Sequence, residues 1–265
     1  MGKKRADILL FEKGLVDSRE KGKRLIMEGV VFIGTEKVQK PGDFISEDDE
    51  IVVKNNPLIY VSRGGLKLEK AIEFFNLDLK DKVAMDIGAS TGGFTDCMLK
   101  NGALKVFAVD VGYNQLDWKL RNDHRVVVME RTNIRNVKLE DIGQQVDFIS
   151  IDVSFISLKL VLPVAKEILK DNGDIVALIK PQFEAGREKV GKKGIVREKS
   201  THMEVIKNTL KFSKDMGLIL DSLTYSPVTG ATGNIEFLAR FKKSGDMVDE
   251  IMIQNIIDDA HSNLK

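Results

Sequence analysis

The sequence lacks several features that define common classes of protein. Its single cysteine, Cys97, cannot form an internal disulfide, and three scattered histidines cannot supply the Cys/His spacing of a zinc site. No apolar run approaches the roughly 18 to 20 residues that cross a bilayer. These absences argue against a disulfide scaffold, a zinc-binding module and a helical membrane protein. They lead us to expect a soluble cytoplasmic protein without a structural metal.

A large net charge of either sign is also missing. The chain has 41 Lys and Arg residues against 40 Asp and Glu residues, which gives a formal charge of +1. Any nucleic-acid binding must therefore come from a local basic surface. Residues 3–24 hold such a surplus, and within them Arg19 and Lys23 lie four apart, so they share one helix face that suits phosphates. Such a face is often only solvated, and the pattern alone leaves both interpretations open.

Sequence patterns divide the chain into two domains. Two helical patterns, the second opened by Ser18, are followed by short strands with Gly and Pro punctuation. This order predicts a small α+β domain at residues 1–54. The break at Asn55-Asn56-Pro57 predicts a linker at residues 55–62. The remaining residues, 63–265, then form a second and larger domain.

The larger domain has the alternating strand and helix patterns of an α/β fold. From Val83 onward, short apolar runs alternate with helical patterns, which predicts right-handed crossovers and a parallel sheet. Only the loop PVTGATGN separates the last two runs, so these strands should be antiparallel neighbours. We expect a Rossmann-like sheet with an antiparallel last strand, the architecture of many methyltransferases. The expected strands are VAMDIG, VFAVDV, VVVME, VDFISID, DIVALIK, LILDSLTYS and IEFLARF. We also expect one helix that ends at Lys100, one near residue 118, and two that span about 157–170 and 199–216.

A glycine-rich turn marks the predicted cofactor pocket. DIGASTGGF, residues 86–94, lies at a strand-to-helix junction, but its spacing is not the G-x-G-x-x-G of dinucleotide enzymes, which disfavours NAD. Asp110 ends the next strand, where a carboxylate can accept hydrogen bonds from ribose hydroxyls. Asp86 could orient the loop or face the cationic end of the cofactor, and ERTNIRN could cover its adenine. Ordinary turn glycines remain the alternative. The cofactor-binding candidates are Asp86, Gly88, Ser90, Gly92, Gly93, Asp110 and Asn133.

Four charged residues fall at or near the carboxyl ends of the expected parallel strands, where the functional sites of open α/β sheets lie. Asp152 and Lys180 each close an apolar strand, Glu236 opens the last strand, and Lys67 precedes the sheet in SRGGLKLEK. A charge that ends an apolar strand is costly unless it is paired, so this set favours a functional cluster. A purely structural ion pair is the alternative.

The segments YVSRGGLKL, DIGASTGGFTDC, AVDVGYNQL, IDVSFISL, IKPQFEAGR and TGATGNIEFL resemble the TlyA group of ribosomal RNA 2′-O-methyltransferases. This group, also known under the name haemolysin, lies within the FtsJ-like superfamily, and the resemblance runs through nearly the whole chain. The N-terminal module, with RADILLFEKG and SREKGKRLI, resembles an RNA-binding domain of a small-subunit ribosomal protein. The RNA-binding candidates there are Arg5, Arg19, Lys23 and Arg24.

The resemblance implies three expectations for this chain: S-adenosylmethionine as cofactor, ribosomal RNA or ribosomal subunits as partner, and cytidine as the target nucleotide. It also implies a catalytic Lys-Asp-Lys-Glu tetrad: Lys67, Asp152, Lys180 and Glu236. Lys70 competes with Lys67, since it lies about one helical turn away. We expect Lys180 to be the base that takes the hydroxyl proton, which requires a neutral amine. No metal is needed, because the sulfonium is already activated.

Other interpretations stay open at this point. A membrane-active haemolysin would need a strongly amphipathic or spanning segment, and only IMIQNIIDDA offers a modest pattern, which we expect to dock on the core. A non-catalytic RNA-binding or ribosome-assembly factor is the second rival. The basic stretch GREKVGKKGIVREK could order on RNA or be a plain surface loop. Trp118 and Phe183 could stack on bases, although Trp118 is expected to pack in the core or the cofactor wall.

Overall fold

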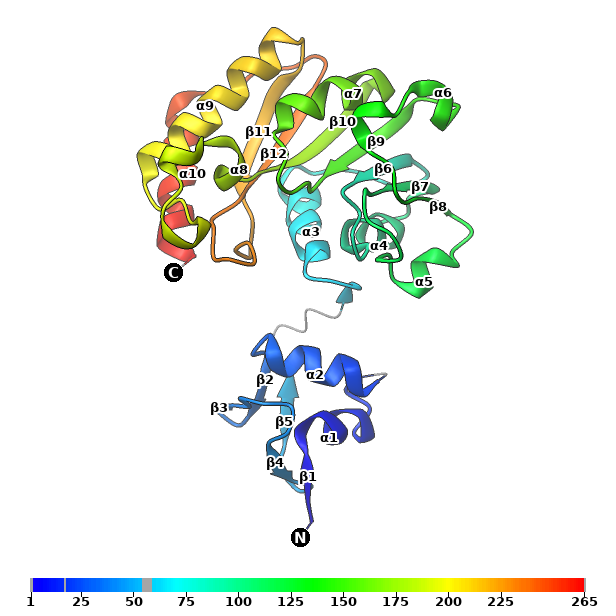
Figure 1. Ribbon diagram of the computed structural model, residues 1–265, viewed down its shortest axis with the longest axis vertical. Coiled ribbons are helices and arrows are strands. Elements are labelled where there is room, and N and C mark those ends of the chain that lie inside the picture. Colours follow the sequence, from blue (N-terminus) through cyan, green and yellow to red (C-terminus); the bar gives the residue numbers. More distant parts are fainter. Residues whose placement is uncertain (1, 17, 54–58, 265) are drawn as a thin grey trace. The chain divides into compact units, whose positions relative to one another are not determined.

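A computed structural model describes residues 2–16, 18–53 and 59–264, which fall into two compact units, Met1–Ile59 and Tyr60–Lys265 (Figure 1). The break expected at Asn55-Asn56-Pro57 lies outside the described residues. Tyr60, which we placed in the linker, instead packs into the second unit: it is 5% exposed, and its hydroxyl donates a 2.7 Å hydrogen bond to Glu69.

The first unit has the small α+β organisation that the sequence predicts. Ser18 caps the second helix by accepting a hydrogen bond from the backbone N–H of Lys21, and Leu10, Leu25 and Ile26 form the centre of the unit's core. One strand was missed: residues 3–5 carry three basic side chains, yet they pair antiparallel with the strand that begins at Phe44. The elements are β1 (Lys3–Arg5), α1 (Ala6–Glu12), α2 (Arg19–Met27), β2 (Val31–Ile33), β3 (Glu36–Lys37), β4 (Phe44–Ser46) and β5 (Ile51–Val53).

The second unit is built on one seven-stranded sheet, and its strands match the seven apolar runs of the sequence. In chain order they are β6 (Val83–Ile87), β7 (Lys105–Val109), β8 (Val126–Met129), β9 (Val146–Ile151), β10 (Leu169–Ile179), β11 (Ile219–Tyr225) and β12 (Phe237–Lys242). Their spatial order is β11-β12-β10-β9-β6-β7-β8. All neighbours are parallel except for β12, which pairs antiparallel with both β10 and β11. The expected Rossmann-like fold with a reversed last strand is confirmed.

Helices cover both faces of this sheet (Figure 1). One face packs against α3 and α4 through side chains such as Leu68 and Met98, and the other packs against α7, α9 and α10 through Leu162, Ile206 and Ile257. The C-terminal helix thus docks on the core as expected. The helices are α3 (Gly64–Phe74), α4 (Gly93–Lys100), α5 (Trp118–Arg121), α6 (Leu139–Ile142), α7 (Leu162–Ile168), α8 (Pro181–Glu184), α9 (Lys199–Asp215) and α10 (Glu250–Asn263).

The helix expected at 157–170 is shorter than the sequence pattern indicates. A 3₁₀ turn at Leu158–Leu160 comes first, and α7 begins at Leu162 with Pro163 in its first turn, where proline needs no N–H partner. At its other end, Leu169 already pairs with Val146 of β9. Within the described ranges, no helix is long and apolar enough to cross a membrane.

Candidate active site

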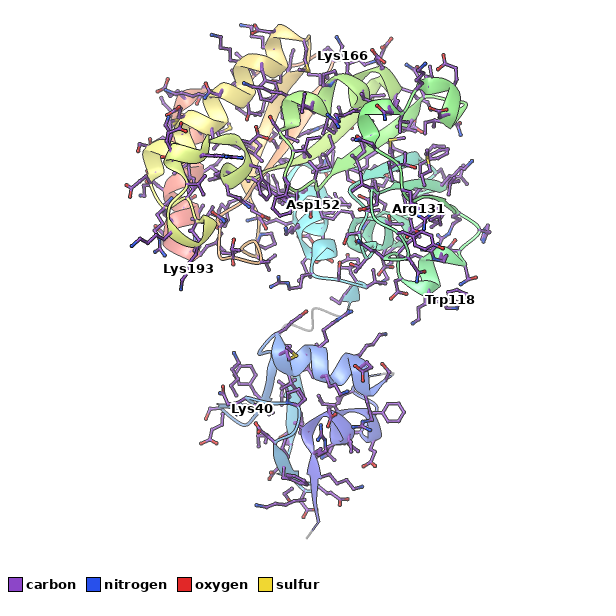
Figure 2. All side chains as sticks on the ribbon, viewed as in Figure 1. Lys40, Trp118, Arg131, Asp152, Lys166 and Lys193 are labelled. Atoms are coloured by element: carbon purple, nitrogen blue, oxygen red, sulfur yellow. The ribbon has the colours of Figure 1, made fainter. Side chains whose placement is uncertain are left out.

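The four residues expected to form a catalytic tetrad lie together at one edge of the sheet. Asp152 follows β9, Lys180 follows β10, and Glu236 directly precedes β12. Because β12 runs opposite to its neighbours, its first residue lies at the same edge as the last residues of the others. Lys67 comes from α3, so the cluster joins four segments (Figure 2 labels Asp152).

Short contacts connect the four side chains in one chain of alternating charge. Lys67 Nζ lies 2.6 Å from Glu236 Oε2 and 3.7 Å from Asp152 Oδ2. Lys180 Nζ lies 2.6 Å from Asp152 Oδ1. Lys67, Lys180 and Glu236 are 9%, 8% and 2% exposed, so these charges are largely removed from water. Two ammonium groups face two carboxylates, and this balance is what makes their burial tolerable.

Ser154 is a member of this cluster that the sequence reasoning missed. Lys180 Nζ donates a 3.1 Å hydrogen bond to Ser154 Oγ. A hydroxyl can also donate, so Ser154 can partner this amine in its charged and in its neutral form. Asp152 Oδ1 is buried, and the Lys180 ammonium lies 2.6 Å from it as an ion pair. The available signal was position: Ser154 lies two residues after Asp152.

The geometry distinguishes the two competing lysines of α3. Lys67 contacts both carboxylates, whereas Lys70 Nζ lies 3.5 Å from the centroid of the Tyr225 ring. Burial lowers the pKa of Lys70. Glycines set the position of α3, because a Cβ on Gly93 would lie 2.9 Å from the backbone N of Gly65. The close approach of α4, which begins at Gly93, to α3 therefore requires a residue without a side chain.

A cavity of about 690 Å³ adjoins the cluster at the ends of the first strands. Its wall includes Asp152 and Ser154, so the cavity and the charged cluster share residues. Four of the seven cofactor-binding candidates also line it: Gly88, Ser90, Asp110 and Asn133.

Asp110 is oriented by the backbone around it. Its Oδ2 accepts a 2.8 Å hydrogen bond from the N–H of Ser90, and its Oδ1 accepts one of 2.6 Å from Gly112. A carboxylate has about four lone-pair sites, so capacity remains for two further donors. This leaves Asp110 able to accept hydrogen bonds from a pair of hydroxyl groups in the cavity.

The other three candidates lie at or beside the start of α4, outside the cavity wall. Gly92 caps α4 with φ of +93°, and Gly93 packs on α3. Asp86 is fully buried and accepts hydrogen bonds from Thr95 and Ser150, so it orients the start of α4, the first of the two roles considered. Burial raises the pKa of Asp86 to about 7. None of these three residues is in the cavity wall.

Gly88 links the cavity to the cluster. Its φ is +87°, and a Cβ there would lie 2.5 Å from the carbonyl oxygen of Asp152. The Asp152 N–H in turn donates to the carbonyl of Ile87. The glycine-rich turn therefore touches the backbone of the tetrad carboxylate, and position 88 has no room for a side chain.

The two aromatic residues considered for base stacking, Trp118 and Phe183, differ in their exposure to solvent. Trp118 was expected to pack in the core or the cofactor wall, but that was wrong: it is 73% exposed at the first position of α5 (Figure 2). Phe183 is partly buried, and its ring centroid lies 5.0 Å from that of Phe155, which is 90% exposed. The adjacent Cys97 and Met98 pack in the core.

Glu184 holds the segment after Asp152, and the sequence reasoning missed it. Its carboxylate accepts hydrogen bonds from the Ser157 hydroxyl at 2.7 Å and the Leu158 N–H at 2.8 Å. Burial raises the pKa of this carboxyl. The contact joins α8 to the loop that carries Ser154, so it fixes part of the cavity wall.

In the first unit, the proposed basic face is partly engaged in ion pairs. Arg5 and Arg19 both bind the buried Asp7 carboxylate, at 3.0 and 3.2 Å, and together they lower its pKa. Lys23 pairs with Glu20. Both arginine side chains stay about half exposed, so they keep donors that face solvent. The described residues contain no group of three or more His, Cys, Asp or Glu side chains placed to hold a metal ion.

Comparison with known proteins gives consistent matches over both units. A family model described as FtsJ-like methyltransferase matches residues 60–243, and one described as S4 domain matches residues 4–51. The Bacillus subtilis protein named "Putative rRNA methyltransferase YqxC" is 53% identical over 99% of this chain and 96% of its own length. The "16S/23S rRNA (cytidine-2'-O)-methyltransferase TlyA" of Mycobacterium tuberculosis is 40% identical over 91% of each. A solved structure named "Putative hemolysin from Streptococcus thermophilus" is 49% identical, with a TM-score of 0.79, over 99% of this chain and 97% of that one.

Proposed function

Since the chain belongs to the TlyA group of the FtsJ-like methyltransferase family, we propose that it transfers a methyl group from S-adenosylmethionine to the 2′-hydroxyl of a cytidine ribose in ribosomal RNA. The observation that carries the proposal is the shared wall: the cavity is lined by Asp152, a member of the Lys-Asp-Lys-Glu cluster, and by Ser154, which accepts a hydrogen bond from Lys180. A cofactor in the cavity would therefore lie beside the groups that act on the hydroxyl. We place this activity in the cytoplasm, with ribosomal subunits as partner.

The residues of the cavity fit S-adenosylmethionine. Asp110 keeps acceptor capacity for the two ribose hydroxyls, and Gly88 allows the backbone to approach the ligand closely. Asn133 follows the third strand and would lie along the adenine. When bound, S-adenosylmethionine supplies a methyl group on a sulfonium that is already activated for transfer.

The cluster supplies what the ribose hydroxyl needs. A neutral hydroxyl group is a poor nucleophile, so it must lose its proton as the new bond to the methyl carbon forms. Lys180, in its neutral form, takes that proton. Asp152 does not lose its only cation when Lys180 becomes neutral, because Lys67 Nζ stays 3.7 Å from its other carboxylate oxygen. Glu236 fixes Lys67 in this place through the 2.6 Å contact.

The S4 domain, which matches residues 4–51, would find the RNA. Arg5 and Arg19 have defined orientations, because both are held on Asp7, and their exposed N–H groups suit phosphate oxygens. Lys23 and Arg24 lie on the same helix and would extend this contact. Phosphate contacts carry no sequence information, so this domain supplies affinity, and the choice of nucleotide is made elsewhere.

The test is transfer of a labelled methyl group to ribosomal subunits from a strain in which this gene is deleted. We expect label in 2′-O-methylcytidine after nuclease digestion, and separate assays of small and large subunits identify the substrate. Incorporation into a base or into protein would contradict the proposal. So would leakage of liposomes by the RNA-free protein without any methyl transfer, which is the result expected of a haemolysin.

A further inference from the structure

We propose that the loop between α8 and α9, residues 186–198, binds phosphates of the RNA strand that flanks the target nucleotide. We call this segment the basic loop. The inference rests on the proposed function, because it concerns the RNA that the active site would receive. It adds a second contact surface, on the methyltransferase unit itself, to the one expected on the S4 domain.

Most cations of the basic loop have no acidic partner among the described residues. It holds five Lys and Arg residues against two Glu residues. One of the five, Lys189, is bound to Glu204 on α9. The other four are exposed, and none forms an ion pair with any residue that the structure describes: Arg187, Lys192, Lys193 and Arg197. These four side chains therefore keep their charge for an external anion.

The backbone of the loop is nevertheless fixed. The N–H of Gly191 donates to the carbonyl of Ile195, and Val196 is 3% exposed. Lys193 adopts φ of +66°, a left-handed conformation that a lysine takes only when its surroundings hold it there. Figure 2 shows Lys193 at the periphery of the unit. Exposed lysines on a fixed backbone lose less conformational entropy on binding than lysines on a mobile one.

A buried asparagine anchors this turn. Asn234 is fully buried, and its Oδ1 accepts a 2.9 Å hydrogen bond from the N–H of Val196. Its Nδ2 donates to the carbonyl of Gly194 at 2.8 Å and to the hydroxyl of Thr232 at 2.9 Å. A single amide therefore ties the basic loop to the segment that precedes β12.

That segment also holds the tetrad glutamate. Asn234 is two residues before Glu236, and a Cβ on Gly230 would lie 2.6 Å from Glu236 Oε1. At its other end, the basic loop begins six residues after Lys180. The loop thus emerges from the same edge of the sheet as the cluster, and both of its ends are attached to tetrad segments. A strand whose ribose reached Lys180 would continue over this edge of the unit.

RNA phosphate is the ligand chemistry that these groups fit. Lysine and arginine side chains on an exposed turn bind phosphate oxygens without reading bases, and each contact adds to the salt dependence of affinity. No aromatic side chain stands among residues 186–198, so the loop is not built to stack on bases. The basic loop therefore contributes affinity and direction to the strand, with little sequence preference.

The experiment compares two double variants of the full chain that lose the same charge. Lys192→Gln/Lys193→Gln removes two cations of the basic loop. Lys211→Gln/Lys214→Gln removes two exposed cations from α9 and serves as the matched control. The probe is unmethylated ribosomal RNA transcribed in vitro, and its affinity is measured over a series of salt concentrations. Unchanged S-adenosylmethionine affinity confirms that each variant is folded.

We expect the loop variant to bind RNA more weakly and to lower the slope of log affinity against log salt by about 1.4 to 1.8, the sum for two lost phosphate contacts. The control should keep the wild-type slope. Equal slopes for the two variants would overturn the proposal. Methyl transfer by the wild type is measured on the same RNA, so its absence counts against the proposed function, whereas the slopes test the loop separately.

Discussion

Replacing Lys180 by arginine tests the proton-transfer role most directly. Lys180 is 8% exposed, and its amine lies 2.6 Å from Asp152 and 3.1 Å from Ser154. A guanidinium in its place keeps the positive charge and can still pair with the carboxylate, but it cannot give up its proton at working pH. A structural cation should therefore survive the change, and a base should not.

The expected loss follows from what a positioned base contributes. We expect the single-turnover rate of Lys180→Arg to fall by about 10² to 10⁴, which corresponds to roughly 3 to 5 kcal/mol of barrier. The free energy of unfolding and the affinity for S-adenosylmethionine should change little, because the pairing with Asp152 persists. The assay is rapid-quench transfer of labelled methyl at saturating RNA.

Lys70→Arg is the matched control. Lys70 lies on the same helix as Lys67 but contacts the Tyr225 ring and neither carboxylate of the cluster, so its replacement should leave the rate near wild type. A Lys180→Arg enzyme that retains near-normal single-turnover methylation would refute the assignment of the base. Lys67 or a water-mediated route would then have to remove the proton.

Three further predictions concern the cofactor, the fold and the RNA. Asp110→Ala should weaken S-adenosylmethionine binding by about 1.5 to 3 kcal/mol, since charge-assisted hydrogen bonds are lost, and unchanged affinity in calorimetry would rule out that role. His202 is fully buried with Nδ1 2.9 Å from His261 Nε2, and burial followed by His261 lowers the pKa of His202 to about 4. The stabilisation that comes from the neutral His202 is therefore complete above the unfolded pKa of about 6.5 and is lost as pH falls through 4. Urea unfolding of the wild type should show up to about 3 kcal/mol of destabilisation over this pH range, and His202→Phe should lack it. Equal pH slopes for the two proteins would contradict this. Arg19→Gln/Lys23→Gln should reduce the salt slope of RNA affinity by about 1.4 to 1.8, and retention of the wild-type slope would exclude this face as a phosphate site.

Much of the fold was predictable because the sheet obeys simple patterns. Each of the seven apolar runs forms a strand, and the short loop before Glu236 correctly indicated an antiparallel pair. Positions at strand ends follow from the same pattern, so the sequence alone places Asp152 and Lys180 at one edge of the sheet. Glu236 joins them because the strand that it precedes is reversed.

The remainder depended on contacts between segments that are distant in sequence. Nothing local in Ser154 or Glu184 signals that one binds Lys180 and the other holds the loop after Asp152. The exposure of Trp118 was mispredicted because an aromatic residue in a helical pattern was assumed to face the core, whereas α5 is only four residues long and places its first residue outside. The strand at residues 3–5 was missed because charged side chains gave no alternating pattern, although pairing depends on the backbone.

The position of β12 has a consequence for how the protein is made. In the chain this strand follows both β10 and β11, yet in the sheet it lies between them. The hydrogen bond that joins Lys67 to Glu236 spans 169 residues of sequence. A nascent chain that ends before residue 236 thus lacks one carboxylate of the site and leaves β10 and β11 without their common partner. The last carboxylate of the cluster and the strand that completes the sheet therefore arrive together during synthesis.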